Sequence, residues 1–454
     1  MTTVDVVLSK LKRFLVEKES RELLIKSGSS LAIRLSGSVA TYVLAFFVTR
    51  AYGVSAWGSF MIAFTVLQIL AMFSRIGVDK ALMMHVAAKK QNAEWNEIIG
   101  FYRASLKVIL PISACASVLI FLLAPFLARV VFGNESLCIP IQILATGILP
   151  LAGLMINAES IRGLRKVLWY AFFEKSGYFL LTAFFFFLAW NYFDTIYLAE
   201  ISLVTSLYLL WAISFVIWQN EISKKSIGTI VHFKGAEILE KGLPLMLTGS
   251  AFLLMSWTDT ILLGVFREES EVGLFNIATR LASANSIVLL AVNSFAGPRF
   301  SELFARNDAR GIRKFARRSS SLIVVCSVPV LALIILFPTF LFQLFGVEEV
   351  STELIIALMV LLTGEAVNSL CGSVGLLLQT TGHQKIFRNI ILFSAGFNLL
   401  LSLILVPYYG LTGAAIANAI STIVWNVVAL YYVKRNLGFL NIYSPLKYFK
   451  HGRR

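Results

Sequence analysis

The sequence is divided into long apolar runs, each about as long as a helix that crosses a lipid bilayer. A helix needs about 20 predominantly apolar residues to span the hydrocarbon core. Inside lipid every backbone N–H and C=O must find a partner within the protein, and an α-helix satisfies these groups locally. The chain is therefore predicted to be an all-α integral membrane protein with about twelve transmembrane helices. The predicted spans are 29–50, 57–77, 103–128, 139–161, 168–190, 194–218, 244–266, 273–297, 319–345, 353–380, 386–406 and 412–433.

Composition excludes a soluble fold for a chain of this length. Of the 454 residues, 58% are hydrophobic and only 14% are charged, and the mean hydropathy is +0.79. A soluble domain carries about 25% charged residues, most of them on its surface. The missing charge indicates that much of the outer surface faces lipid.

The loops between the predicted spans alternate in charge. One set is basic, with residues such as Lys89, Arg165 and Arg313, whereas the other set carries mostly carboxylates, such as Glu135 and Glu269. Because Lys and Arg in short loops stay on the cytoplasmic side, we expect both termini on that side of the cell inner (cytoplasmic) membrane. The net charge of +15 lies mostly in these loops, and no nucleic-acid-reading motif accompanies it. Membrane lipids, and not nucleic acid, are the expected partners.

The second half of the sequence repeats the first. The segment WGSF at 57–60 matches VGLF at 272–275, and their glycines, Gly58 and Gly273, are 215 residues apart. Further on, SGYFL at 176–180 matches AGFNL at 395–399 at an offset of 219. Six spans in each repeat make the two copies parallel, related by an axis along the membrane normal, and transporters built this way hold substrate between the halves. We therefore expect two parallel six-helix repeats around a central cavity.

This repeat sets the predicted organisation of the chain. Glycines such as Gly37, Gly58, Gly273, Gly410 and Gly413 are predicted to allow close helix packing or tight turns at the membrane edge. The predicted parts are a cytoplasmic amphipathic N-terminal segment (1–28), a first six-helix bundle (29–218), a cytoplasmic linker (219–243), a second six-helix bundle (244–433) and a basic cytoplasmic tail (434–454).

Five segments carry a family resemblance. They are RAYGVSAWGSF at 50–60, DTILLGVFREESEVGLFNIATRL at 259–281, PRFSELFA at 298–305, LLLQTTGHQK at 376–385 and LVPYYGLTGAAIAN at 405–418. Together they resemble the bacterial polysaccharide-biosynthesis flippases, the lipid-linked oligosaccharide exporters of the multidrug/oligosaccharidyl-lipid/polysaccharide superfamily. The resemblance implies two six-helix bundles in a V around a cavity. It also implies a substrate, a sugar unit on undecaprenyl pyrophosphate that moves from the inner to the outer leaflet by alternating access.

Two other functions compete with this one. A multidrug-type, ion-coupled exporter of small molecules shares the superfamily and the fold. A membrane-embedded glycosyltransferase or polymerase would need a sizeable outer loop for its acceptor and catalytic residues, and every predicted outer loop is short, so we expect a transporter and not an enzyme. If the protein is a flippase, polysaccharide polymerase machinery is an expected partner.

Ionisable residues inside spans are costly and mark candidate functional sites. Arg280, Arg34, Asp259 and Asn276 are the candidate substrate-binding residues, because arginine binds phosphate through two hydrogen bonds at once. Asp259 and Arg280 lie at similar depth on adjacent spans, where an ion pair between them is geometrically reasonable; it would be either structural or a carboxylate that holds the cation until the pyrophosphate arrives. Arg34 lies near a span end, where its side chain can instead snorkel to the headgroups.

Glu365 is the candidate for ion coupling, because it falls near the middle of its span. The alternative is a neutral, hydrogen-bonded carboxyl beside Asn368. Glu174, Lys175 and Glu200 are weaker candidates near span ends. No histidine or cysteine shows metal-ligand spacing, so we expect no cofactor beyond a proton or sodium ion that couples transport. The remaining polar candidates, for sugar contact or helix packing, are Asn157, Asn285, Asn293 and Asn398.

Overall fold

The computed structural model describes residues 18–193, 195–223, 225 and 229–441, and every element in this part of the chain is helical. The predicted segments 1–28 and 434–454 therefore lie partly outside the described residues. The elements are α2 (Lys18–Arg75), α3 (Val78–Gln91), α4 (Trp95–Phe126), η1 (Leu127–Val131), η2 (Glu135–Leu137), α5 (Cys138–Ala145), α6 (Ile148–Gly163), α7 (Val167–Ala171), η3 (Phe172–Ser176), α8 (Gly177–Ala189), α9 (Leu198–Ile222), α10 (Gly235–Phe266), α11 (Glu269–Ser283), α12 (Ser286–Ala305), α13 (Ala309–Leu336), α14 (Pro338–Leu344), α15 (Thr352–Cys371), α16 (Val374–Thr380) and α17 (Gln384–Leu437).

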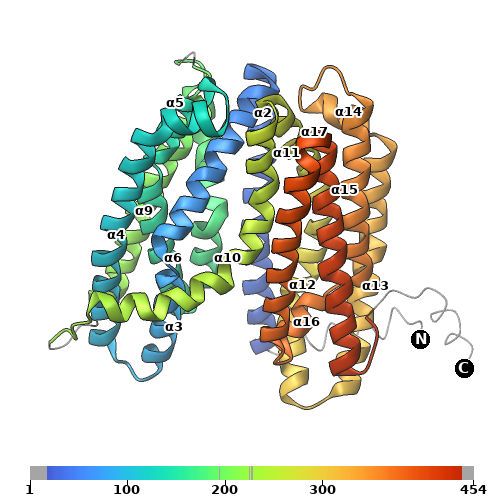
Figure 1. Cartoon of the computed structure of the whole chain (residues 1–454). Coiled ribbons are helices and arrows are strands. Elements are labelled where there is room, and N and C mark those ends of the chain that lie inside the picture. Colours follow the sequence, from blue (N-terminus) through green and yellow to red (C-terminus); the bar gives the residue numbers. More distant parts are fainter. Residues whose placement is uncertain (1–17, 194, 224, 226–228, 442–454) are drawn as a thin grey trace, which may run out of the picture.

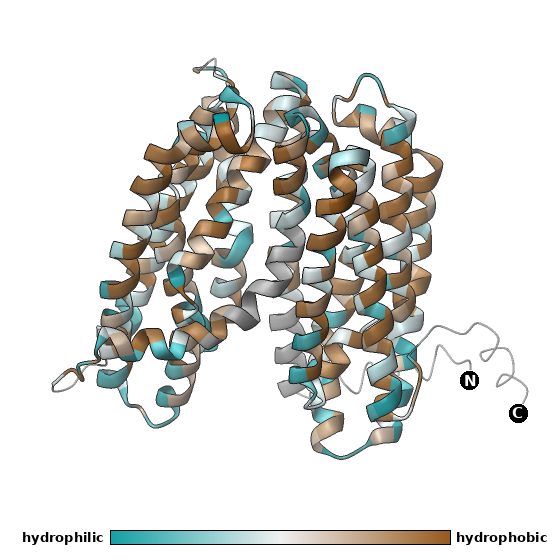
Figure 2. Cartoon of the chain, viewed as in Figure 1, coloured by the Kyte–Doolittle hydropathy of each residue, from teal (hydrophilic) through white to brown (hydrophobic). Residues whose placement is uncertain are grey.

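The helices have the length and surface of a membrane bundle. In the described part of the chain, seven helices are long and apolar enough to cross a membrane, or nine if each of two bent helix pairs forms one span. Figure 2 shows apolar residues along the flanks of the long helices and hydrophilic residues gathered towards the two ends of the bundle. The all-helical membrane fold is confirmed, whereas the number of twelve spans stays a prediction.

Two of these helices are too long for a single crossing. The apolar part of α2 has 48 residues and α17 has 54, which correspond to about 72 Å and 81 Å of helix against a hydrocarbon core of about 30 Å. Each is broken by one glycine with a non-helical backbone, Gly53 (φ 86°) in α2 and Gly410 (φ 49°) in α17. Only glycine adopts such a positive φ freely, so both breaks are positions where the chain turns back at the membrane edge.

The helices form two halves that stand side by side (Figure 1). The first half comprises α2 to α9, in which α2 packs on α6 and α8, and α9 packs on α8. The second half comprises α10 to α17, in which α15 packs on α17. Helix α10 crosses between them, because it contacts α3 of the first half and α17 of the second.

The loops lie at two opposite ends of the bundle. We call one the acidic end, with the loops after η1, α10 and α14, and the other the basic end, with the turns that flank α3 and α16 (Figure 1). At the acidic end, α2 of the first half packs closely on α11 of the second. A Cβ added to Gly58 would collide with the backbone of Glu269, and a Cβ added to Gly273 would collide with the carbonyl of Val54. The predicted role of these two glycines in close packing is confirmed, and the two repeat-equivalent residues are the contact point between the halves.

Two loops add reciprocal contacts around this point. The loop FGNES at 132–136 in the first half corresponds to FGVEE at 345–349 in the second, 213 residues later. Ser136 of the first loop donates a hydrogen bond to Glu269 of the second half. Arg50 of the first half donates to the carbonyl oxygens of Leu344 (3.3 Å) and Gln343 (3.5 Å), beside the second loop. Each half therefore reaches over to the other at the acidic end.

Candidate functional site

A cavity of about 480 Å³ lies between the two halves. Most of its wall comes from the first half, and α10 and α12 of the second half complete it. The first half contributes polar side chains on α2, α3, α6, α7, η3 and α8, including Gln68 and Tyr178, which hydrogen-bond to each other at 3.4 Å. The apolar residues from the second half are Leu245, Met246, Trp257 and Leu290.

Charged side chains in the first-half wall are joined into a network. Arg34 forms an ion pair with Glu174 at 2.7 Å. Glu159, which is only 2% exposed, forms an ion pair with Lys80 and a second one with Arg162 at 3.3 Å. The hydroxyl of Tyr170 lies between the carboxylates, 2.9 Å from Glu174 and 3.3 Å from Glu159. Each charge in this network is thus compensated by an ion pair.

Arg34 takes this position because α2 approaches η3 closely. A Cβ added to Gly37, one turn after Arg34, would lie 2.6 Å from the Cβ and Oγ of Ser176. The predicted packing role of Gly37 is confirmed. Arg34 is paired with a carboxylate at the cavity, so the structure favours the cavity position over simple snorkelling to headgroups.

Arg280 lies on the other side of the junction, on α11, and contacts the first half. Its guanidinium carbon is 5.0 Å from the centre of the Trp57 ring, and Nη2 is 3.6 Å from the sulfur of Met61. Its buried Nε has no hydrogen-bond partner, and no carboxylate in the described part of the chain lies within ion-pair distance. A cation held over an aromatic face is stabilised, but its hydrogen-bonding capacity remains largely unused.

The predicted ion pair between Asp259 and Arg280 is wrong. Asp259, which is 1% exposed, is turned towards α17 and accepts hydrogen bonds from Asn418 (2.8 Å), Ser402 (2.9 Å) and Asn398 (3.3 Å). The two helices present these residues to different neighbours, α17 for Asp259 and α2 for Arg280. Depth along a span can be counted in the sequence, whereas the face of the helix depends on packing.

The carboxylate of Asp259 is satisfied by neutral donors, two amide N–H groups and one hydroxyl. Within the described residues, the buried amide oxygen of Asn398 has no hydrogen-bond partner. Across the described residues, no group of three or more His, Cys, Asp or Glu side chains gathers as metal ligands.

Glu365 lies against the bend between α11 and α12, where the helix axes differ by 47°. Its carboxylate accepts a hydrogen bond from Ser286 at 2.7 Å and lies 3.5 Å from the amide nitrogen of Asn368. Asn285, at the same bend, donates to the carbonyl oxygen of Glu365. The predicted proximity to Asn368 is confirmed, and the role of Glu365 in ion coupling stays a prediction.

Asn276 does not line the cavity. It is 8% exposed and donates to the carbonyl of Val272 in its own helix at 2.9 Å, so its predicted contact with sugar stays a prediction. Sequence reasoning missed Glu159, Lys80 and Tyr170. Glu159 falls two residues before the end of a predicted span, where a carboxylate resembles an interfacial residue, and only packing reveals that it is buried.

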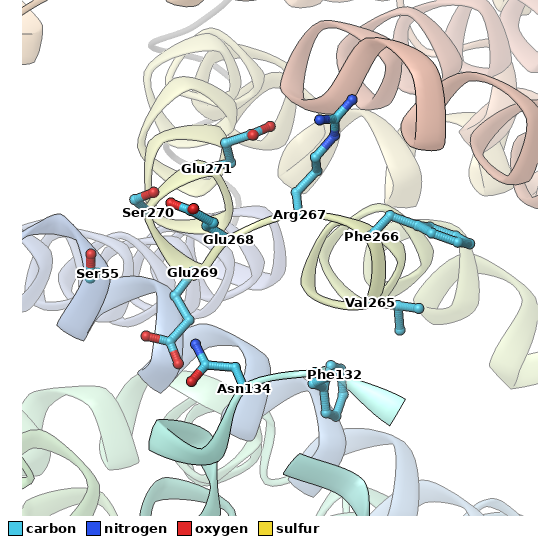
Figure 3. A pocket seen from close by; sticks show the side chains of 11 residues that line it. Ser55, Phe132, Asn134, Val265, Phe266, Arg267, Glu268, Glu269, Ser270 and Glu271 are labelled. Atoms are coloured by element: carbon cyan, nitrogen blue, oxygen red, sulfur yellow. The ribbon is translucent and has the colours of Figure 1, made fainter. Parts of the chain in front are cut away.

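A second hollow of about 650 Å³ opens at the acidic end. Figure 3 shows Glu269 reaching towards Asn134 of the first half, while Arg267 points away towards α17, where it donates to the carbonyl of Pro407. The carboxylates of Glu268, Glu269 and Glu271 line this hollow, so it repels anions. The cavity with the cations is therefore the candidate binding site for an anionic substrate.

Comparison with known proteins identifies relatives. The family model described as polysaccharide biosynthesis protein matches residues 23–304, which are 282 of the 454 residues. A second family model, MatE, matches residues 244–404. The probable low-salt glycan biosynthesis flippase Agl15 of Haloferax volcanii is 25% identical over 193 residues, 42% of this chain and 40% of Agl15. The probable flippase AglR of the same organism is 27% identical over 179 residues, 38% of this chain and 37% of AglR.

The matched part of the chain thus spans about two fifths of the length of these curated relatives. Among solved structures, the chain is similar to an inward-facing multidrug resistance MATE family transporter of the MOP superfamily, with a TM-score of 0.69, 15% identity, and coverage of 90% of this chain and 98% of that one. It is also similar to the lipid II flippase MurJ in an inward closed conformation, with a TM-score of 0.68, 15% identity, and coverage of 90% and 87%. At such identity the likeness concerns the fold alone.

The match over more than half of the residues, the two repeated helical halves and the cavity between them lead to one conclusion. The chain belongs to the polysaccharide biosynthesis protein family and has the fold shared by MATE transporters and MurJ.

Proposed function

We propose that this protein is a flippase that moves an oligosaccharide linked to undecaprenyl pyrophosphate from the inner to the outer leaflet, for cell-surface polysaccharide synthesis. The basic end of the bundle faces the cytoplasm in this proposal, because basic loops remain on that side. The substrate enters the cavity between the halves, and the halves then rock to open the acidic end. The product would supply polysaccharide polymerase machinery on the outer side.

The main support for this proposal is the guanidinium of Arg280 at the junction of the halves, which has no ion-pair partner in the described part of the chain. An unpaired charge away from water is expensive, and it is retained where an anion will meet it. A pyrophosphate has the charge and the planar oxygen pairs that a guanidinium binds through two parallel hydrogen bonds. The relatives named as glycan flippases support the sugar-linked part of the substrate.

Coupling to an ion gradient is assigned to the second half. Asp259 and Glu365 are carboxylates held by neutral donors, so each can gain a proton or a cation without breaking an ion pair. Both lie on helices that contact α17, and α10 also contacts the first half. A change at Asp259 is therefore placed to alter how the halves meet.

The alternative, a multidrug-type exporter, is supported by the MATE fold and makes a different prediction about the cavity. Cationic drugs would need unpaired carboxylates there, whereas Glu159, Glu174 and Asp79 are each paired with a cation.

The test is accumulation of lipid-linked oligosaccharide on the inner leaflet of cells at matched protein level. Arg280→Ala is expected to block most export, and Arg280→Lys to restore only part of it, because lysine keeps the charge without the two-pronged geometry. Normal polymer export with Arg280→Ala would reject the proposal and favour the drug exporter.

A further inference from the structure

One side of α13 is cationic where the helix begins and apolar along the rest of its length. The helix starts at the basic end and packs on α12 and α15 of the second half (Figure 1). Ile312 and Ala316 are buried on its inner side. At 100° per residue, the exposed cations of its first turns fall on the opposite side, within an arc of about 140°. We call them the cationic face: Arg310, Arg313, Lys314, Arg317 and Arg318.

An exposed apolar stripe continues this face towards the other end of α13. Leu322, Val325 and Val328 are 44%, 59% and 56% exposed, and they lie on the same side of the helix as the cations. Because α13 is long and apolar enough to span a membrane, the stripe faces the acyl chains of the lipids. The cationic face therefore stands directly beside the hydrocarbon layer.

The length of the apolar part places most of these cations among lipid headgroups. Residues 319–336 correspond to about 27 Å of helix, close to the hydrocarbon thickness of about 30 Å, and the headgroup layer on each side adds about 5–7 Å. Arg317 and Arg318 lie within about 3 Å of the apolar part along the helix axis, and Arg313 lies about 9 Å from it, within reach of its long side chain. Arg310, at about 14 Å, lies beyond the headgroups.

The cationic face has no counter-ion in the part of the chain that the structure describes. Arg299 and Arg306, at the two ends of the preceding turn region, both form ion pairs with Glu302, at 2.5 Å and 3.0 Å. Asp308 accepts a hydrogen bond from the backbone at the start of α13 at 2.7 Å, and residues 309–347 contain no Asp or Glu. Three pairs within the cationic face are four residues apart, a spacing at which like charges repel each other.

We propose that the cationic face of α13 is a binding site for anionic phospholipids in the leaflet at the basic end of the bundle. Clusters of four to eight Lys or Arg residues next to a spanning segment attract anionic headgroups. A phospholipid is favoured over a soluble acidic protein, because one lipid molecule offers a phosphate to the cations and acyl chains to the adjoining apolar stripe. No residue of α13 lines the cavity between the halves. The inference is therefore independent of the transported substrate.

The test titrates the purified full-length protein with phosphatidylglycerol or with phosphatidylcholine of the same acyl chains, and native mass spectrometry measures the bound lipid. The parent should bind phosphatidylglycerol more tightly. Arg317→Gln and Arg318→Gln should each weaken phosphatidylglycerol binding about fivefold, and the double variant about 25-fold, with phosphatidylcholine binding unchanged. The melting temperature should not fall, because the substitutions remove repulsion between like charges.

Arg306→Gln is the matched control, because Arg306 is an exposed arginine that is already paired with Glu302 and lies outside the cationic face. It should bind both lipids like the parent, and Arg310→Gln should have a smaller effect than Arg317→Gln. Equal affinity of the parent for the two lipids, or an unchanged preference in the double variant, would overturn the inference. If soluble polyglutamate displaces phosphatidylglycerol and Arg310→Gln weakens binding as much as Arg317→Gln, the face meets a soluble acidic partner and the lipid site is rejected.

Discussion

The two ends of the bundle differ in how the two halves meet. At the acidic end the halves touch backbone to backbone at Gly58 and Gly273, with no side chain between them. Towards the basic end they are separated by a cavity whose wall carries ion-paired side chains, such as Arg34 with Glu174. A contact made by glycines can separate and re-form without breaking strong polar interactions, whereas charged walls suit a wet, ligand-binding space. Under the proposed function, the acidic end is the one that closes and the cavity is the place that receives the substrate.

The two halves also differ in how they hold buried carboxylates. In the first half Glu159 is bound by cations, Lys80 and Arg162. In the described part of the second half, Asp259 and Glu365 are bound by hydroxyl and amide groups. Ion pairs fix a charge in place, and neutral donors leave it free to bind a proton or cation. Under the proposed function, the first half therefore shapes the cavity and the second half responds to the coupling ion.

The largest effect is expected from filling the glycine contact. Gly58→Leu and Gly273→Leu should each abolish export, because the new side chain would meet the backbone of the other half and prevent closure at the acidic end. Export is measured as before, and closure is measured by labelling Ser55→Cys from outside with a membrane-impermeant maleimide, which should increase. Gly396→Leu is the control, since a Cβ at Gly396 meets no atom nearby. Normal export by Gly58→Leu would show that transport does not need the close glycine contact at the acidic end.

The next effect concerns the second-half carboxylates. Asp259→Asn and Glu365→Gln should reduce transport about tenfold or more while substrate binding remains near that of the parent, because they remove an ion-binding charge outside the cavity. Transport into proteoliposomes with and without sodium or proton gradients separates the two residues, since the variant at the coupling site should lose its response. The control is Asn426→Ala, because Asn426 is a buried polar residue that donates a hydrogen bond to Thr422 of its own helix. Full activity of both carboxylate variants across pH 6 to 8 would show that Asp259 and Glu365 have only a structural role.

A smaller effect is expected from the reciprocal loops at the acidic end. Ser136→Ala removes one hydrogen bond between the halves and Arg50→Gln removes two, all at the exposed rim of the acidic end. A hydrogen bond there contributes about 0.5–1.5 kcal/mol, so each variant should shift the equilibrium towards opening by a few fold. The rate of maleimide labelling at Ser55→Cys should rise moderately in each single variant. In the double variant it should rise by the product of the two single increases. An unchanged labelling rate would mean that the glycine contact alone closes this end.

The smallest effect is expected for the Arg34–Glu174 pair. Both side chains are about one third exposed, at 37% and 35%, so solvent screens the pair. A double-mutant cycle with Arg34→Gln and Glu174→Gln should give a coupling free energy of about 0.2–1 kcal/mol in thermal unfolding. A value several times larger would show that this wall is drier and more rigid than its exposure indicates.

The internal repeat shows what a sequence pattern can predict about the packing and what it cannot. The offset of 215 residues identified Gly58 and Gly273 as equivalent, and small residues predict close packing. The pattern did not say that these two residues pack near each other. The matching FGNES and FGVEE loops, which make the reciprocal contacts, are short and could not be separated from chance similarity in the sequence.

The candidate site illustrates the same limit. Arg34, Asp259, Arg280 and Glu365 could be selected because charges in apolar runs are rare. Their partners could not, since Glu174 is about 140 residues from Arg34, and Asn398 about 140 from Asp259. Lys175, which the sequence offered only as a weaker candidate near a span end, lines the cavity between the halves.

The sequence by itself determined the membrane class, the helical fold, the repeat and the family resemblance, because these depend on local hydropathy and on motifs along one chain. Only the tertiary structure decided which charges are paired and which are left free. A span can be read residue by residue, but the face that a side chain presents is set by the packing of helices far apart in sequence. Packing gave Asp259 three neutral partners and, among the residues that the structure describes, left Arg280 without a counter-ion.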